Sequence, residues 1–159
     1  MRDVALFAIY TGLRFSDLNT LTSDHIVHER GKTWLVKQPV KTKNTSSVTV
    51  RLPIYALFGG KALRLIERYG TVEKLAHVGN NAAANRTLKE IVRKVGIPES
   101  RHITFHVCRH SFVTLLLSKG IPITSVQKLA GHQKIDMTLR YTHLASTVVD
   151  KEVEKAFKY

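Results

Sequence analysis

The sequence predicts an α+β domain that is mainly helical and carries one small three-stranded antiparallel sheet. Apolar residues recur at helical spacing over most of the 159 residues. Three runs rich in β-forming residues follow one another between residues 25 and 52, separated by turn residues. Two of the helical patterns are followed by a glycine and then a proline, at Gly96 and Pro98 and at Gly120 and Pro122, which is the expected order at helix ends.

The expected elements can be placed in order along the chain. An apolar face from Val4 to Ile9 predicts a first helix that ends near Gly12, and Ser16 is expected to cap a short second helix through about Leu21. Strands are expected at residues 25–30, 33–40 and 47–52, with hairpin turns at 31–32 and 43–46. Further helices are expected at about residues 61–69, 83–95, 105–119, 124–129, 137–142 and 147–158.

Length and charge limit the classes of function. A chain of this length corresponds to one domain, residues 1–159, and 43% hydrophobic residues are enough to build a core. Lys and Arg number 25 against 12 acidic residues, and the net charge of +13 predicts a polyanionic partner, most commonly nucleic acid. A structural RNA-binding protein would share this charge, so charge alone does not indicate an enzyme.

Two absences in the sequence bear on where the protein acts. No apolar run approaches the roughly 20 residues that span a bilayer, and no signal-peptide segment opens the chain, so we expect a cytoplasmic protein without a membrane partner. Cys108 is the only cysteine, which excludes an intrachain disulfide. We interpret Cys108 as a small buried hydrophobic residue on a helix.

Residues that could act on a phosphodiester are concentrated in the C-terminal third. His106 and Arg109 lie in the segment His-Val-Cys-Arg-His, His132 follows Gly131, and Tyr141 comes nine residues later. His106 and Arg109 are three residues apart, so they share one face of a helix. A tyrosine hydroxyl can attack phosphorus without a metal when cations hold the non-bridging oxygens and a basic group takes up its proton.

Two earlier segments supply further cations. Arg14 lies in Thr-Gly-Leu-Arg, and Lys41 lies in Val-Lys-Thr-Lys near the tip of a predicted hairpin. The planar fork of arginine can bind two phosphate oxygens at once. Lys37, Lys41 and Lys43 have the same parity, so regular strand alternation would put all three on one face, and periodicity does not choose among them.

The ordered set resembles the catalytic domain of the tyrosine recombinases, the integrase family of phages and mobile elements, over nearly the whole chain. The resemblance implies that fold, and it implies site-specific recombination or integration for a bacterial mobile element. Tyr141 would cleave a DNA strand and form a 3′-phosphotyrosyl intermediate. A 5′-hydroxyl from a partner strand would then displace the tyrosine and rejoin the DNA, without a cofactor. The implied catalytic set is Arg14, Lys41, His106, Arg109, His132 and Tyr141.

The resemblance also implies a role for each of these side chains. The two arginines would hold the phosphate, and His106 would accept or relay the proton of the nucleophile. Lys41 would protonate the leaving 5′ oxygen, and His132 would donate a hydrogen bond to a non-bridging oxygen. The family pattern of a Lys-Thr pair before the turn favours Lys41 as this proton donor, and Lys43 is the alternative.

Partners and assembly follow from the same resemblance. Double-stranded DNA is the expected ligand, and a tetrameric synapse of identical subunits, associated with the nucleoid, is the expected assembly. The amphipathic tail at 147–159 would dock on a neighbouring subunit. We expect a fragment of a longer protein that lacks the N-terminal DNA-binding domain of the family.

Simpler interpretations of single residues stay open. The two arginines could be solvated surface cations or partners of Asp17 and Asp136, and His132 could be an exposed imidazole at a helix end. His110 is expected to point away from the site and to support the helix. His106, Cys108 and His110 have a spacing that could suit a metal, but the companion glutamate of a metalloprotease is missing.

Two other functions would use the same fold. A type IB topoisomerase would relax DNA by similar chemistry, although the His-x-x-Arg pair at residues 106–109 favours a recombinase. A DNA-binding module that has lost activity is the non-enzymatic alternative. Six intact site positions argue against it.

Overall fold

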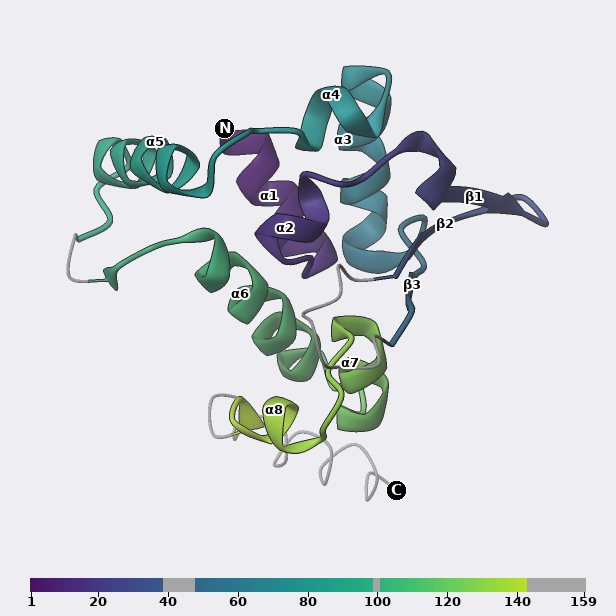
Figure 1. The fold of residues 1–159 in the computed structure, drawn as a ribbon. Coiled ribbons are helices and arrows are strands. Elements are labelled where there is room, and N and C mark those ends of the chain that lie inside the picture. Colours follow the sequence, from purple (N-terminus) through teal and green to yellow (C-terminus); the bar gives the residue numbers. More distant parts are fainter. Residues whose placement is uncertain (39–47, 99–100, 143–159) are drawn as a thin grey trace.

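The computed structural model of the chain describes residues 1–38, 48–98 and 101–142 (Figure 1). The helices are α1 (Arg2–Thr11), α2 (Phe15–Leu18), α3 (Lys61–Tyr69), α4 (Val72–Ala76), α5 (Asn81–Lys94), α6 (Phe105–Ser118), α7 (Ile123–Ala130) and α8 (Asp136–Leu139). The strands are β1 (Ile26–Glu29), β2 (Lys32–Lys37) and β3 (Val50–Leu52), and short 3-10 helices span Ser23–His25 and Leu57–Gly60. The predicted α+β class with a small three-stranded antiparallel sheet is confirmed.

The core is centred on α1 and α6, which lie against each other in the middle of the molecule (Figure 1). Phe7, Ala8 and Phe112 have no exposed surface. Gly12 ends α1 in the left-handed conformation, with φ 66°, and its N–H donates to the Ala8 carbonyl at 2.8 Å. A side chain at Gly12 would collide with the Phe112 ring, so only glycine lets the chain turn this close to α6.

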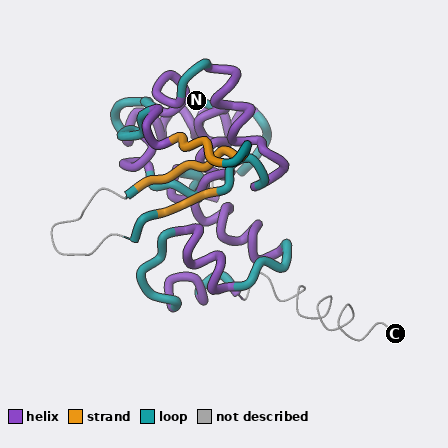
Figure 2. Tube along the Cα trace, turned by 90° about the vertical axis from the view of Figure 1, so that its right-hand side faces the viewer, coloured by secondary structure: helices purple, strands orange, loops and turns teal. Residues whose placement is uncertain are grey.

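The sheet has the order β1-β2-β3, and both pairings are antiparallel (Figure 2). The register aligns Glu29 with Lys32, so the turn residues are Arg30 and Gly31 rather than the predicted 31–32. Both have positive φ, 49° and 71°, as a two-residue hairpin turn requires.

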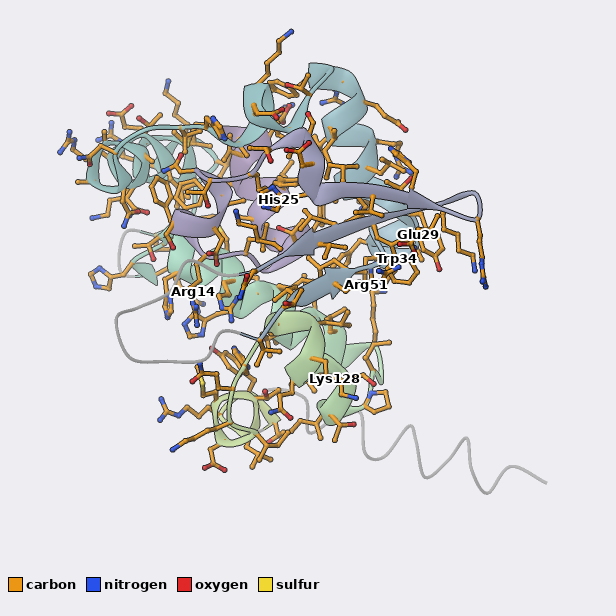
Figure 3. All side chains as sticks on the ribbon, turned by 45° about the vertical axis from the view of Figure 1, so that its right-hand side comes forward. Arg14, His25, Glu29, Trp34, Arg51 and Lys128 are labelled. Carbon is orange, nitrogen blue, oxygen red and sulfur yellow. The ribbon has the colours of Figure 1, made fainter. Side chains whose placement is uncertain are left out.

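The two faces of the sheet differ in polarity. On the outer face the Arg51 guanidinium lies 4.4 Å from the centroid of the Trp34 ring and pairs with Glu29 (Figure 3). On the inner face Lys37 is buried, and its Nζ donates to the Thr20 carbonyl at 2.7 Å. Lys37 is therefore occupied in the interior and is not available to a ligand.

The start of α2 differs from the prediction. Arg14, not Ser16, occupies its N-cap position, and the helix ends at Leu18 instead of continuing to about Leu21. Among the described residues, no side chain caps the N-terminus of α2. The short helix is held instead by its buried residues, Asp17 and Leu18, so packing and not capping sets its limits.

Polar caps explain two further differences. Asn80 accepts hydrogen bonds from the N–H groups of Ala82 and Ala83, so α5 begins two residues earlier than predicted. The Thr71 side chain accepts from the Lys74 N–H at the start of α4, a helix that the apolar pattern did not predict. Its five residues are too few to show a helical period.

The α3 helix has its predicted bounds, and α6, α7 and α8 agree with the prediction within a few residues. The predicted helix at 147–158 lies outside the described residues. No helix in the described part of the chain is long and apolar enough to cross a membrane.

Candidate active site

Arg14 reaches the surface from the short connection between α1 and α2. The neighbouring Leu13 is buried and anchors this connection in the core, whereas Arg14 is exposed. Figure 3 shows Arg14 on the side of the molecule away from the cluster of Glu29, Trp34 and Arg51. The backbone of Arg14 is thus held by the buried Leu13, while its side chain is accessible to a ligand.

Arg109 is fixed in the interior by two backbone carbonyls. Its Nη1 donates to the Gly12 carbonyl and its Nη2 to the Ala130 carbonyl, each at 2.6 Å, and the residue is only 8% exposed. Both carbonyls lie at the C-terminal ends of helices, where the helix dipole favours a cation. A guanidinium has five N–H donors, so Arg109 can hold α1 and α7 together and still bind a phosphate.

The charge of Arg109 is set by its surroundings. Burial lowers its pKa to about 10, and the Arg14 cation acts in the same direction, whereas Asp17 and Tyr141 act in the opposite one. Arg109 remains a cation at neutral pH. The interpretation of Arg109 as a solvated surface residue is wrong, because its side chain is buried between two helix ends.

His132 follows the glycine that ends α7. Gly131 has φ 64°, and a Cβ there would lie 2.5 Å from Val50 Cγ2. The N–H of His132 donates to the Gln127 carbonyl at 3.0 Å, and Gln127 Nε2 donates to the His132 carbonyl at 3.2 Å. The imidazole Nδ1 lies 2.8 Å from Thr138 Oγ1. Backbone and ring are therefore both fixed.

The interpretation of His132 as an exposed imidazole is also wrong. His132 is 5% exposed, and burial is the main cause that lowers its pKa to about 4. Arg109, Arg14 and His110 lower this pKa further. The ring is neutral at pH 7, so it acts on a ligand as a hydrogen-bond donor or acceptor and not as a cation.

Three rings connect α6 to the residue expected to be the nucleophile. The centroids of His106 and His110 are 4.3 Å apart, and those of His110 and Tyr141 are 5.1 Å apart. The prediction that His110 points away from the site is wrong. His110 lies one helical turn beyond His106 on the same face of α6, which brings it beside Tyr141.

Tyr141 is half-buried next to these histidines and stacks on His132, with 6.4 Å between the ring centroids. Burial raises the pKa of its phenol, while the charges of Arg109 and Arg140 act in the opposite direction. The hydroxyl is therefore protonated at neutral pH, and nucleophilic attack requires a base. Burial, His106 and Arg109 lower the pKa of His110, which leaves it neutral and able to accept a proton.

These side chains line one open cleft of about 450 Å³. Its lining consists of Arg14, His106, Arg109, His110, His132, Met137, Arg140 and Tyr141. Five of the six predicted catalytic residues, from four separate segments of the chain, are thus brought together. The sixth, Lys41, and its alternative Lys43 lie outside the described residues.

The arrangement around Cys108 does not fit the metal site considered from the sequence. Cys108 is buried as predicted, and burial raises the pKa of its thiol to about 11. His106 is exposed at the cleft, so the thiol and this imidazole face different surroundings. Within residues 1–38, 48–98 and 101–142, no group of three or more His, Cys, Asp or Glu side chains could hold a metal ion.

The predicted site leaves out several residues at or behind the cleft, among them Asp17, which the sequence suggested only as a partner of an arginine. Asp17, three residues after Arg14, is buried and supplies negative charge near Arg109. His110 and Thr138 contact the site directly through Tyr141 and His132. The spacing of four residues from His106 could have identified His110, because it puts both side chains on one face of α6. No such spacing identifies Thr138, because its side chain contacts His132, which lies before α8.

Comparison with known proteins agrees with this geometry. The model of the phage integrase family matches residues 1–147. The chain belongs to this family. Tyrosine recombinase XerA of Pyrococcus furiosus is 30% identical over 167 residues, which cover 98% of this chain and 54% of the relative. The integrase of Salmonella phage P22 is 26% identical over 163 residues, which cover 91% of this chain and 39% of the relative. The chain thus spans about half the length of these family members, or less.

Comparison with a solved structure concerns the fold. The XerH site-specific recombinase bound to its palindromic difH substrate, in a post-cleavage complex, superposes with a TM-score of 0.69. Sequence identity is 19%, and the match covers 96% of this chain and 44% of the recombinase. The predicted tyrosine recombinase catalytic-domain fold is confirmed.

Proposed function

We propose that this chain is the catalytic domain of a tyrosine-type site-specific recombinase that cleaves and rejoins DNA through a 3′-phosphotyrosyl intermediate at Tyr141. The observation that carries the proposal is the cleft in which three arginines, three histidines and a tyrosine meet. This set can position a phosphodiester and stabilise its transition state without a metal ion. The names of the relatives support the same class of reaction.

In the cleavage step the Tyr141 oxygen attacks phosphorus, and the bond from phosphorus to the 5′ oxygen breaks. Arg14 and Arg109 hold the non-bridging oxygens, because each guanidinium offers paired donors and a charge that persists at neutral pH. His132 donates a hydrogen bond to the same oxygens. The phosphodiester energy is conserved in the covalent bond, so a 5′-hydroxyl of a partner strand can reverse the step.

Two proton transfers accompany this exchange. The phenolic proton goes to a histidine, and the ring of His110 between His106 and Tyr141 provides a two-step route to the exposed His106. The leaving 5′ oxygen takes its proton from Lys41, the role that the family resemblance implies for it.

The biological setting is part of the proposal. We place the enzyme in the bacterial cytoplasm, on the nucleoid, as an integrase of a mobile element that assembles on double-stranded DNA as a tetramer, with residues 147–159 docked on a neighbouring subunit. The net charge of +13 supports DNA as the partner. The chain spans 54% of the archaeal relative, so the activity proposed is that of the corresponding whole protein.

Covalent trapping tests this function and does not require a known target site. A pool of random-sequence duplexes, nicked just downstream of the randomised region, releases a short fragment after cleavage and so traps the adduct. The protein should accumulate DNA that survives denaturation, and excess EDTA should leave the yield unchanged. An adduct that is lost in EDTA and restored by a divalent ion would contradict the metal-free mechanism.

The matched variants are Tyr141→Phe and Tyr55→Phe. The first removes the proposed nucleophilic oxygen and should abolish the adduct while DNA binding changes little. The second removes a hydroxyl from a ring that packs against Trp34 on the outer face of the sheet, and it should cleave normally. An adduct formed by Tyr141→Phe would exclude this tyrosine as the nucleophile. Relaxation of supercoiled DNA without strand exchange would favour a topoisomerase.

A further inference from the structure

Thr138 is the buried partner of the His132 imidazole at the inner side of the cleft. Thr138 has no exposed surface, and its Oγ1 lies 2.8 Å from His132 Nδ1. Its carbonyl accepts the N–H of Tyr141 at 3.1 Å. One residue thus contacts both the proposed oxyanion donor and the proposed nucleophile.

The direction of the hydrogen bond between Thr138 and His132 follows from the surroundings of the hydroxyl. Within the described part of the chain, Thr138 Oγ1 has His132 Nδ1 as its only hydrogen-bond partner. If the ring donated from Nδ1, the buried hydroxyl proton would have no acceptor there, at a cost of about 1–3 kcal/mol. If the hydroxyl donates to Nδ1, both groups are satisfied, and the proton of the neutral ring is then on Nε2.

The nearby arginines make this tautomer unfavourable without help. The charges of Arg14 and Arg109 both act on His132, and a cation repels an N–H and attracts a nitrogen lone pair. Without the Thr138 hydroxyl as donor, these charges would favour a lone pair on Nε2, the ring nitrogen left for a ligand, and the proton would be on Nδ1. That form could not donate to a phosphate oxygen from Nε2, the ring nitrogen that is not bonded to Thr138.

We propose that Thr138 is a positioning residue that keeps His132 in the Nε2–H tautomer, so that a neutral imidazole donates to the non-bridging oxygen, and that ties this donor to the backbone of Tyr141. The inference rests on the proposed function for its catalytic consequence. The tautomer itself is a property of the DNA-free chain and can be measured without any reaction.

The first measurement is the tautomer. Two-bond ¹H–¹⁵N correlation spectra of the imidazoles in the full chain at pH 7 distinguish a protonated ring nitrogen from one with a lone pair. The expected result for His132 is a protonated Nε2 and an unprotonated Nδ1. A protonated Nδ1 in the wild-type chain would overturn the proposal, whatever the protein does to DNA.

Variants connect the tautomer to cleavage. Thr138→Val keeps the shape and removes the hydroxyl, so the His132 proton should move to Nδ1 and adduct formation should slow by roughly tenfold to a hundredfold, a large part of the loss expected on removing one such donor. Thr138→Ser should restore both the tautomer and the rate. Thr142→Val is the control, because its hydroxyl donates to the Leu139 carbonyl and not to an imidazole.

The outcomes separate the two claims. A Thr138→Val chain that keeps Nε2–H and cleaves at the wild-type rate would overturn the positioning role. If the wild-type chain shows the expected tautomer but never forms an adduct, the proposed function fails and the assignment of the hydrogen bond stands. Because the wild-type spectrum alone decides the tautomer, a poorly folded valine variant does not remove the test.

Discussion

The buried and exposed parts of the cleft differ in how their side chains are held. Arg109, His132 and Thr138 form a buried wall, in which ring or guanidinium atoms are fixed by backbone carbonyls or by a neighbouring hydroxyl. Arg14, at the N-terminus of α2, and His106, on α6, are exposed and form the rim of the cleft. The wall is preorganised before DNA arrives, whereas the rim is free to adjust to a bound phosphate. Catalysis by fixed charges depends on the first property.

Among the groups around the proposed nucleophile, the largest effect on activity is expected from Lys41, the proposed proton donor to the leaving group. Lys41→Ala should slow cleavage by about 10²–10⁴-fold, the usual range for loss of a general acid. A substrate with sulfur in place of the 5′-bridging oxygen needs no acid and should restore the rate.

The same sulfur substrate distinguishes a proton donor from the wall. Arg109→Ala should remain slow with sulfur, because the wall stabilises charge and moves no proton. Rescue of Lys43→Ala in place of Lys41→Ala would shift the assignment by two residues. Rescue of Arg109→Ala would remove the distinction between the two kinds of residue.

Replacing each of the two arginines should have a different effect on the stability of the fold, although both are proposed to act on the same phosphate. Arg109→Ala and Arg14→Ala should each slow cleavage by on the order of 10²-fold. Arg109→Ala also leaves two buried carbonyls without their donor, at about 1–3 kcal/mol each, and should lower the urea midpoint clearly. Arg14→Ala should change stability by less than about 0.5 kcal/mol, as surface substitutions usually do. Equal urea midpoints for the two variants would contradict the division into wall and rim.

A separate effect is expected on the dependence of stability on pH. The pKa of His132 is about 4 in the folded chain, below its ordinary value of 6.5, so between these values the unfolded chain binds a proton that the folded chain does not. Stability from this group is complete above pH 6.5 and falls by up to about 3 kcal/mol as the pH approaches 4.

Urea unfolding at about pH 7 and about pH 4.5 measures this loss. His132→Asn should lose less stability between the two pH values than the wild type. The carboxylates titrate in the same way in the two chains, so they do not contribute to this difference. His28→Asn, at the far strand of the sheet, is the control and should behave as the wild type. The same slope in all three chains would mean that His132 is not held neutral by the wall.

The residues of the rim and the proposed nucleophile can be located from the sequence, because they lie in short motifs. Thr-Gly-Leu-Arg and His-x-x-Arg each specify a residue and its helix end, and Tyr141 follows His132 at a fixed distance. The three strands and α3 were predictable from alternation and helical period. Lys41 was not separable from its neighbours by these means, because strand parity is the same for all three lysines.

The sequence predicts Arg109 and His132 as site residues, but it does not predict the contacts that hold the wall, because these contacts join distant segments. Arg109 donates to the Gly12 carbonyl 97 positions away and to the Ala130 carbonyl 21 positions away, and a sequence pattern identifies neither acceptor. Ser16 was expected as a cap on composition alone, and burial of Asp17 and Leu18 determined α2 instead. Adjacency to Arg109 in the sequence does not place His110, because its spacing of four residues from His106 puts it on the same face of α6, beside Tyr141.

The central claim is that Tyr141 becomes covalently attached to DNA, and peptide mapping of the trapped adduct tests it most directly. After nuclease and trypsin treatment, cleavage follows Arg140 and Lys151, so residues 141–151 form one peptide that contains a single tyrosine. Mass spectrometry should find a nucleotide remnant on this peptide, at Tyr141. A remnant on a peptide that carries any of the other four tyrosines would contradict the account.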